Sequence, residues 1–545
     1  MRLMNSRQER NDSGTNKDQS VMCLWGVRVS GLEMSKILSK VSLGFFIAIG
    51  LIACSDLPSG EPIQFDSVIS NGQLVDGLGG SGRAADVYLK DGVIAAITAP
   101  GELDAVVTNT IDATGKIIAP GFIDVHSHGD PLETPNFENF LAQGVTTITL
   151  GQDGDSPNVV DLDEWIEEVS EKGIGVNLAM FVGHGTLRNL AGIAQDPAPG
   201  PDQIQRMLDL LNNSLDHAFG LSTGLEYNPG LHALESELIE MAKVVGSRDR
   251  VIMSHMRNED DDQLEKSIDE LLSQGLYARV HISHLKSVYG KGSARAEEIL
   301  EVIERAREAG IDLSADVYPY NASYAGLALL FPVWSKTDEE FAVAVSGRRE
   351  ELEEYLINRI TLRNGPEATL LATDPYTGKT LADLEQELGL PFEEILIDVI
   401  GPQGGSGAYF IMDDELQSRL LLDESITVSS DGSPTGFHPR GHGTFAKIIE
   451  EYVVNRAALP LEEAVRKMTS YAAELLGVTD RGSVEVGKAA DLIIFDPILV
   501  RAKASYSDPL QLAEGFDVVI VNGEVAFFNG AGLAVASGEV LSPSE

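Results

Sequence analysis

Short apolar segments alternate with amphipathic ones over most of this chain. The amphipathic stretches, such as 294–309, space their apolar residues as on one face of a helix. The apolar segments have the length of buried strands, and their repetition between helices is typical of a parallel sheet. Over residues 121–480 this alternation predicts an α/β fold, a closed (β/α)8 barrel. Strands after the first are predicted at 145–150, 176–181, 218–222, 251–254, 278–283, 311–316 and 426–431.

Two departures from this alternation predict further parts of the fold. Charged helical stretches at 338–358 and 381–399 interrupt it and indicate an insertion late in the barrel, at about 330–405. Strand and hairpin patterns occupy 63–120 and return at 481–540. We expect these two β-rich segments to fold together into one small β-sandwich beside the barrel.

The charge of the chain limits its partners. Among 545 residues, 84 are acidic and 40 are lysine or arginine, so the formal net charge is −44. The acidic residues are spread along the sequence and repel nucleic acid phosphates and anionic membrane surfaces. We therefore expect a small-molecule substrate and no nucleic acid partner. The composition leaves the oligomeric state open.

The N-terminus has the pattern of a bacterial export signal. Basic residues precede the apolar stretch 41–53, which is too short to cross a bilayer as a helix. This stretch ends in Leu-Ile-Ala-Cys at Cys54, which resembles a lipobox and predicts lipid attachment to that cysteine. We expect 1–54 to be a disordered N-terminus with a lipoprotein signal, and the alternative is a buried apolar helix.

The predicted lipid sets the expected location. Ser55 follows the cysteine, and in a Gram-negative cell the absence of aspartate there fits anchoring to the outer membrane, facing the periplasm. One lipid anchors a protein to a membrane without making it an integral membrane protein. The only other cysteine is Cys23, so any metal in the folded body must be held by His, Asp, Glu or a modified Lys.

Histidines and aspartates stand where the predicted strands end. His126 and His128 close the apolar run that begins at Pro120, and strand residues at i and i+2 point to the same side. The later strands run into Asp153, His255, His284 and Asp431. A single histidine at a strand end is more often structural, but five such ends in strand order favour a shared site. Because catalytic groups of a barrel lie at the C-terminal ends of its strands, this set predicts a centre for zinc or a similar divalent ion.

Local motifs extend this pattern over most of the chain. Besides the H-x-H they are 220–230 (GLSTGLEYNPG), 254–259 (SHMRNE), 282–286 (ISHLK), 316–320 (DVYPY), 430–432 (SDG), 438–440 (HPR), 443–445 (GTF) and 487–492 (GKAADL). The order H-x-H, His, His, Asp resembles that of the amidohydrolase superfamily. The motifs more closely resemble its N-acyl-D-amino-acid deacylases, or D-aminoacylases, and the likeness runs from about residue 65 to 525.

This resemblance implies an activity and a set of roles. It implies hydrolysis of the amide bond of N-acyl-D-amino acids or D-dipeptides, at one or two zinc or similar divalent ions. By resemblance, His126 and His128 hold one metal position with Asp431, and His255 and His284 hold the neighbouring one. Asp431 would also be the catalytic base, taking a proton from water and returning it to the leaving amine.

One position departs from the family pattern. Deacylases often have a cysteine at the end of the second strand that bridges the metals, and here Gly-Gln-Asp-Gly stands at 151–154. Asp153 is a candidate carboxylate bridge in place of the thiolate. The alternative is a loop-capping aspartate, which would leave a single metal.

Further residues are candidates for substrate binding. Lys286, Tyr227 and Tyr318 match family positions that bind the α-carboxylate, and Arg257 is a further possible donor. His184 follows a strand and either lines the pocket or packs behind it. Tyr324 is a candidate for selecting the substrate side chain.

Two other functions are alternatives. One is a cyclic amidase of the dihydroorotase or hydantoinase type, which would open ring amides. The other is a non-enzymatic lipoprotein that keeps the barrel as a surface-binding module. The near-complete ligand set argues against the second, because a decayed site would be expected to lose its ligands first.

Overall fold

The computed structural model describes residues 64–534 and 536–543. Cys54 and the predicted export signal lie outside these residues. No helix within the described part is both long and apolar enough to cross a membrane.

Eight parallel strands form the sheet at the centre of the fold. Their order is β16-β12-β11-β10-β9-β8-β7-β6, so neighbours in the sheet are mostly neighbours in sequence. The strands are β6 (Phe122–Asp124), β7 (Val145–Leu150), β8 (Asn177–Gly183), β9 (Gly220–Gly224), β10 (Val251–His255), β11 (Arg279–Ile282), β12 (Leu313–Val317) and β16 (Ile426–Val428).

The two edges of this sheet meet just beyond β6 and β16. The Asp431 amide donates to the His126 carbonyl and the His128 amide donates to the Gly432 carbonyl, each at 2.8 Å. These bonds close the strands into a barrel at the point where the candidate ligands stand. The predicted (β/α)8 barrel is confirmed.

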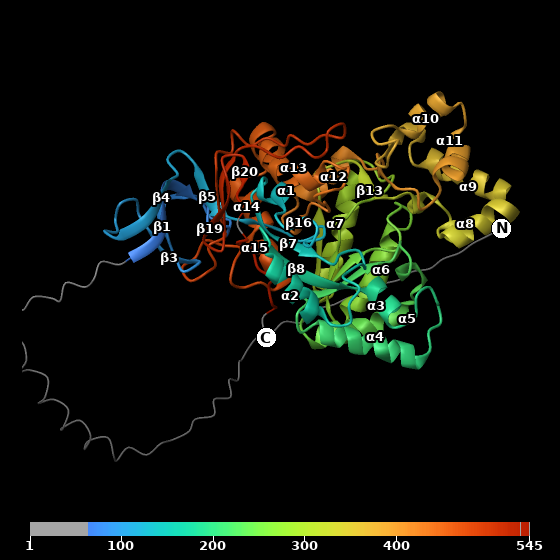
Figure 1. Ribbon diagram of the computed structural model, residues 1–545, viewed down its shortest axis with the longest axis horizontal. Helices are drawn as coiled ribbons and strands as arrows, with labels where there is room; N and C mark the ends of the chain where they lie inside the picture. The colour runs from blue at the N-terminus through green and yellow to red at the C-terminus, as the bar shows by residue number, and fades with distance from the viewer. Residues whose placement is uncertain (1–63, 535, 544–545) are drawn as a thin grey trace, which may run out of the picture. The chain divides into compact units, whose positions relative to one another are not determined.

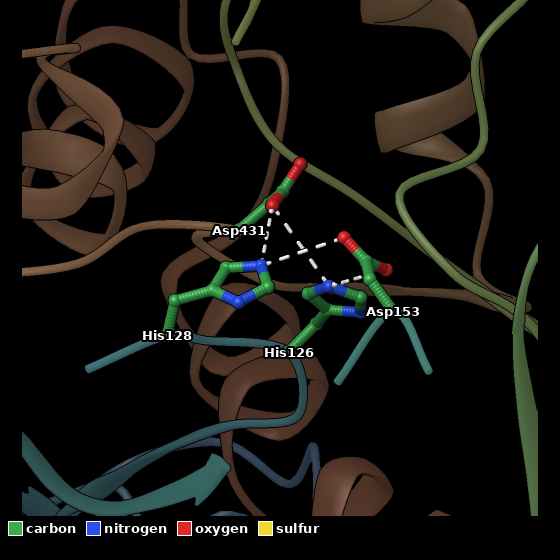
Figure 2. Close-up of side chains that lie close together, drawn as sticks. All are labelled: His126, His128, Asp153 and Asp431. Atoms are coloured by element: carbon green, nitrogen blue, oxygen red, sulfur yellow. Dashed lines mark hydrogen bonds and ion pairs between the residues drawn. The ribbon is translucent and has the colours of Figure 1, made fainter. Parts of the chain in front are cut away.

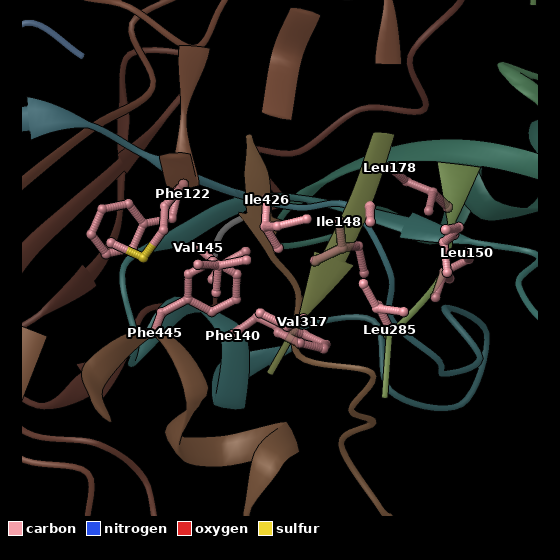
Figure 3. Close-up of a cluster of buried hydrophobic side chains, with 14 of the residues drawn as sticks. Phe122, Phe140, Val145, Ile148, Leu150, Leu178, Leu285, Val317, Ile426 and Phe445 are labelled. Atoms are coloured by element: carbon pink, nitrogen blue, oxygen red, sulfur yellow. The ribbon is translucent and has the colours of Figure 1, made fainter. Parts of the chain in front are cut away.

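Helices cover the outside of the barrel, and both faces of its strands are buried. Along β8, Leu178 and Met180 lie in the cluster that joins sheet and helices, whereas Ala179 and Phe181 lie in a separate cluster that fills the barrel interior. Figure 3 shows part of the larger cluster, in which the rings of Phe122 and Phe445 stack 5.7 Å apart. The helices are α1 (Glu138–Leu141), α2 (Leu162–Lys172), α3 (His184–Leu190), α4 (Pro201–Ser214), α5 (Glu235–Ser247), α6 (Leu264–Gly275), α7 (Gly292–Glu308), α12 (Asp414–Leu422), α13 (Arg440–Lys447), α14 (Leu461–Met468) and α15 (Ser470–Leu476), with the 3₁₀ helix η1 (Gly230–His232) and the π-helix η6 (Ile448–Asn455).

Strands from both ends of the described chain form one nine-stranded sheet. β17 pairs antiparallel with β5, which joins the late strands to the early ones. Along β17, Leu492 and Ile494 face a cluster internal to this sheet, whereas Ile493 and Phe495 face the barrel cluster, because strand side chains alternate. The strands are β1 (Gln64–Leu74), β2 (Arg83–Lys90), β3 (Val93–Thr98), β4 (Val106–Asp112), β5 (Ile117–Pro120), β17 (Leu492–Phe495), β18 (Phe516–Val521), β19 (Glu524–Phe528) and β20 (Ala531–Gly532).

The barrel rhythm is interrupted between β12 and β16 by a segment with its own small sheet and hydrophobic cluster. We predicted about 330–405 for this insertion, and its outer strands extend it to 323–409. Figure 1 shows its helices grouped together in the yellow and light orange part of the ribbon. Its elements are β13 (Ser323–Gly326), η2 (Leu327–Leu330), η3 (Val333–Ser335), α8 (Asp338–Gly347), α9 (Arg349–Leu362), η4 (Pro366–Ala368), β14 (Thr369–Leu371), α10 (Leu381–Leu388), α11 (Phe392–Glu394), η5 (Ile395–Ile400) and β15 (Ser406–Tyr409).

Candidate metal centre and substrate cavity

Four of the predicted ligands converge at the barrel closure. Figure 2 shows His126, His128, Asp153 and Asp431 pointing toward one another, and one donor atom from each lies within 4.8 Å of the others. His128 Nε2 lies 3.2 Å from Asp431 Oδ1 and 3.5 Å from Asp153 Oδ2. His126 Nε2 lies 3.3 Å from Asp153 Oδ1. Nitrogen and carboxylate oxygen are the donors that zinc takes in proteins without thiolates.

A second group of donors lies against the first. Asp153, His255 and His284 also place one donor atom each within 4.8 Å of one another. His284 Nε2 lies 3.2 Å from Asp153 Oδ1, and His255 Nδ1 lies 3.0 Å from His284 Nε2. Asp153 therefore belongs to both groups, which is the arrangement that a bridging carboxylate requires.

The backbone is held in an unusual conformation at three of these residues. Asp153, His284 and Asp431 have φ angles of 54°, 37° and 49°, in the left-handed region that non-glycine residues rarely occupy. Such conformations cost of order 1–3 kcal/mol each and gather at functional sites. The bond from the Asp431 amide to His126 and the 2.9 Å bond from the His284 amide to Asp316 Oδ1 hold two of them in place.

Two buried carboxylates support the ligands from the barrel interior. Asp124 Oδ1 accepts from the Ser430 amide at 2.9 Å, and burial raises the pKa of this aspartate to about 7. Asp316 Oδ2 lies 2.6 Å from His281 Nε2, while Oδ1 holds the His284 amide. These carboxylates fix the strand ends that carry the ligands.

The electrostatics of the donors fit a cation. Both ring nitrogens of His126 are buried and form no hydrogen bond within the described residues, and burial lowers its pKa. Burial alone would lower the pKa of His128 too, but Asp153 and Asp431 outweigh it and raise the pKa to about 9. Burial and Lys286 oppose the positive form of His284, yet the two aspartates raise its pKa to about 10. The carboxylates thus favour positive charge in the place where a metal ion would supply it.

Arg440 forms an ion pair with the candidate base. Its Nη1 lies 2.6 Å from Asp431 Oδ2, and both side chains are buried. Burial would raise the pKa of Asp431, but the charge of Arg440 and then of His284 lowers it below its ordinary value. Asp431 is therefore ionised at neutral pH, with Oδ1 free of the arginine and turned toward the histidines.

Lys286 contacts the ligand set from behind. Its Nζ donates to Glu259 Oε1 at 2.8 Å and lies 2.7 Å from His284 Nδ1. Burial opposes the lysine charge, but Glu259 outweighs it and raises the pKa of Lys286. On the other side, Glu226 Oε2 lies 3.3 Å from His255 Nε2. Such outer partners orient a ligating histidine and set which nitrogen carries its proton.

The donors open into two adjoining cavities. The first, of about 260 Å³, is bordered by His128, Asp153, Tyr227, Tyr324, Asp431 and Arg440, among others. The second is narrower and is bordered by His255, His284 and Lys286 as well as by Tyr227 and Tyr324. The two tyrosines border both cavities, and the Tyr227 ring lies 4.5 Å from that of His255.

Three of the predicted substrate-binding residues do not border these cavities. Arg257 pairs with Glu270 at 2.9 Å and borders a different depression. His184 is buried and its Nε2 lies 2.8 Å from Glu237 Oε1, so it packs behind the site. Tyr318 is fully buried, and its ring lies beneath Arg440 and Lys286, at 5.0 and 5.9 Å.

Sequence reasoning assigned no role to Arg440, Glu226 or Glu259. All three stand inside motifs that carried the family resemblance: HPR at 438–440, GLEY at 224–227 and SHMRNE at 254–259. The signal was therefore present, but nothing in a motif says which charged residue pairs with which ligand.

The fold and the donor set together define a class, the metal-dependent hydrolases built on a (β/α)8 barrel. Comparison with known proteins agrees, since residues 368–527 match the model of the amidohydrolase family. The N-acyl-D-glutamate deacylase of Alcaligenes xylosoxydans xylosoxydans is 32% identical over 85% of this chain and 94% of its own length. The N-acyl-D-aspartate deacylase of the same organism is 32% identical over 89% of this chain and 96% of its own.

A solved structure shows the same similarity. It is the N-acyl-D-glutamate deacylase of Bordetella bronchiseptica, complexed with zinc and a phosphonate inhibitor, with a TM-score of 0.76 and 30% identity over 88% of this chain and all of that one. The protein belongs to the N-acyl-D-amino-acid deacylases of the amidohydrolase family, as its motifs predicted.

Proposed function

We propose that this protein hydrolyses the amide bond of N-acyl-D-amino acids at a zinc centre. The observation that carries the proposal is the convergence of four histidines and two aspartates from five strand ends beside two adjoining cavities. The named relatives and the zinc complex of the Bordetella enzyme support the same activity. The choice of D over L substrates comes from these relatives.

The donor set fits zinc. Its members are imidazoles and carboxylates, and the buried His126 ring has both nitrogens without a hydrogen-bond partner in the described part of the chain. His126, His128 and Asp431 would hold one ion, His255 and His284 would hold a neighbouring one, and Asp153 would join the two. A bound divalent ion polarises an amide carbonyl and lowers the pKa of water toward about 7.

Asp431 has the position of the general base. Its Oδ1 would accept a proton from the attacking water and return it to the leaving nitrogen, which converts a poor amine leaving group into a good one. Arg440 at Oδ2 keeps this carboxylate ionised and limits its rotation. The arginine is thus a positioning residue for the base.

The substrate α-carboxylate needs a cationic neighbour close to the reacting amide. Arg440 and Lys286 are the cations that both border the cavities and contact the ligand set. The Tyr227 hydroxyl is a further donor at the cavity wall, since burial raises the pKa of this phenol and keeps it protonated. These groups would orient the substrate through charge-assisted hydrogen bonds.

The test is hydrolysis by the zinc-loaded protein. We expect release of D-amino acid from N-acetyl-D-amino acids, a much slower reaction with the L enantiomers, and no opening of hydantoin or dihydroorotate rings. His255→Ala should lose activity. His217→Ala should retain it, because His217 is partly exposed in the turn after α4 and pairs with Asp163 of α2. Inactivity on every linear N-acyl-D-amino acid, or ring opening alone, would refute the proposal.

We also propose that the chain is exported and anchored by a lipid on Cys54, in the outer membrane of a Gram-negative cell and facing the periplasm. The lipobox-like sequence that ends at this cysteine supports it. Expression of the full chain with labelled palmitate should label the wild type and not Cys54→Ser. Fractionation should then place the wild type with outer membranes, and an unlabelled wild type would overturn the proposal.

A further inference from the structure

Arg363 is a buried cation on the wall of the candidate active site. It is the residue that follows α9, so it comes from the insertion and not from a barrel strand. Only 3% of it is exposed, yet it borders the narrower cavity together with Asp153, His284 and Lys286. The insertion thereby contributes a guanidinium to the cavity that holds the metal ligands.

Nothing in the described part of the chain neutralises this charge. Among the described residues no ion pair is formed by Arg363. The nearby acids Glu226 and Asp260 pair with Arg359 instead, and the Arg363 Nε is buried without a hydrogen bond. The groups that its guanidinium contacts are aromatic, the Tyr409 ring at 5.2 Å and the Tyr289 phenol. The other cations near this cavity all have partners, as Arg440 pairs with Asp431, Lys286 with Glu259 and Arg359 with Asp260.

An unpaired buried charge is costly, and an anion that enters the cavity would relieve the cost. A guanidinium presents a planar fork of donors that matches a carboxylate in two parallel hydrogen bonds. The acids on the wall are already engaged elsewhere. Glu259 pairs with Lys286, Asp431 with Arg440 and Asp260 with Arg359, while Glu226 and Asp153 contact the ligand histidines. The geometry therefore points to a carboxylate on the substrate.

The positions of the cations distinguish two places where a substrate carboxylate could bind. The α-carboxylate is one carbon away from the scissile nitrogen, so it must bind beside the metal ligands, where Arg440 and Lys286 contact Asp431 and His284. The contacts of Arg363 described above are with Tyr409 and Tyr289, and neither of these is a candidate metal ligand. Arg363 therefore faces a part of the substrate that is farther from the reacting amide.

We propose that Arg363 selects substrates with a second carboxylate, carried by the amino-acid side chain or by the far end of the acyl group. This inference rests on the proposed deacylase function and specifies its substrate class. The insertion would then be the part of the fold that determines specificity, while the barrel carries the chemistry.

Isosteric substrate pairs test the inference, since each pair differs in charge and not in shape. N-acetyl-D-glutamate against N-acetyl-D-glutamine tests the side chain, and N-succinyl-D-methionine against its terminal amide tests the acyl end. In the wild type we expect kcat/KM of the acidic member to exceed that of the amide by about 30-fold or more in one pair. The pair that discriminates identifies the source of the carboxylate.

Variants then assign the preference to this residue. Arg363→Gln should bring the ratio close to one while changing kcat/KM for the neutral member less than about threefold, and Arg363→Lys should give an intermediate ratio. The matched control is Arg349→Gln, at the start of the helix that Arg363 follows. Arg349 pairs with Asp398 at the surface, so this change should leave the ratio unchanged. Each ratio is internal to one preparation, so it stays valid when a variant folds poorly.

Three results would overturn the inference: ratios near or below one in both wild-type pairs, a ratio that survives Arg363→Gln, or equal losses on acidic and neutral members. The last would show that Arg363 binds the α-carboxylate or supports the fold. If the wild type cleaves N-acetyl-D-glutamine well but prefers neither N-acetyl-D-glutamate nor N-succinyl-D-methionine, the inference about Arg363 is wrong while the proposed function stands. Wild type that cleaves no N-acyl-D-amino acid refutes the proposed function.

Discussion

Asp153→Asn gives the sharpest test of the metal centre. Asp153 belongs to both of the donor groups described above, and nitrogens of four histidines lie 3.2 to 3.8 Å from its oxygens. Asparagine keeps the shape of the side chain and removes its charge. The two groups of donors are then no longer joined by an anion.

The magnitude follows from the charge and the distances. Two unit charges 4 Å apart interact by about 4 kcal/mol at an effective dielectric of about 20, before desolvation is counted. Loss of a partner outside the ligand shell typically costs 10–100-fold in metal affinity, so loss of a direct ligand should cost at least the upper end of that range. We expect zinc affinity to fall by about 100-fold or more, or about 2.7 kcal/mol, and the bound zinc to fall from two equivalents to one or none.

Isothermal titration of the metal-stripped protein, with metal analysis after dialysis, measures both quantities. Asp155→Asn is the matched control, because Asp155 lies in the same loop, is exposed, and accepts only a 3.3 Å bond from the Thr186 hydroxyl. Wild-type affinity and stoichiometry in Asp153→Asn would refute the bridging role and leave Asp153 as a loop-capping residue.

Three further predictions concern the general base, a ligand histidine and the hydrophobic core. Arg440→Gln removes the cation that keeps Asp431 ionised. In the pH profile of kcat/KM, the acidic limb should therefore move up by about one to three pH units. An acidic limb that does not move would contradict the role of this ion pair. In metal-free protein, the raised pKa of His284 stabilises the fold fully below pH 6.5, and this stabilisation is lost as pH rises toward about 10. The free energy of unfolding in urea should therefore decline by several kcal/mol over that range. The stabilisation by zinc should instead grow with pH, because the residues that bind zinc must be deprotonated. Phe122→Ala removes a fully buried ring that stacks on Phe445, and it should lower the free energy of unfolding in denaturant by about 3–5 kcal/mol. The control Phe528→Ala, at a half-exposed ring, should lower it by less than about 1 kcal/mol. Similar losses for both variants would show that the Phe122 ring does not pack as described.

The barrel and the types of its ligands were accessible from the sequence because both depend on local order. Apolar segments of strand length between amphipathic helices predict a parallel barrel whatever the details of packing. Since the strands of such a barrel end at one face, residues that follow separate strands must gather there. That reasoning placed His126, His255, His284 and Asp431 in one region from their order alone.

Charge partners could not be predicted in the same way. Arg257 has the same type and strand-end location as a substrate-binding residue, but it pairs with Glu270 thirteen positions later. Arg440 stands in a quoted motif, yet its pairing with Asp431 depends on how the loop after β16 folds back. Several acids and bases follow each strand, and their sequence positions fit many pairings equally well.

The sequence by itself determined the fold class, the family and the residue types of a hydrolytic metal centre, because these follow from periodicity and from the order of strand ends. Only the tertiary structure decided that Asp153 lies between two histidine pairs, that Lys286 and Arg440 contact the ligands directly, and that the insertion brings an unpaired Arg363 to the same cavity. The physical reason is distance along the chain. The closing bond between His126 and Asp431 and the approach of Arg363 join segments far apart in sequence, and such contacts depend on how the whole fold packs.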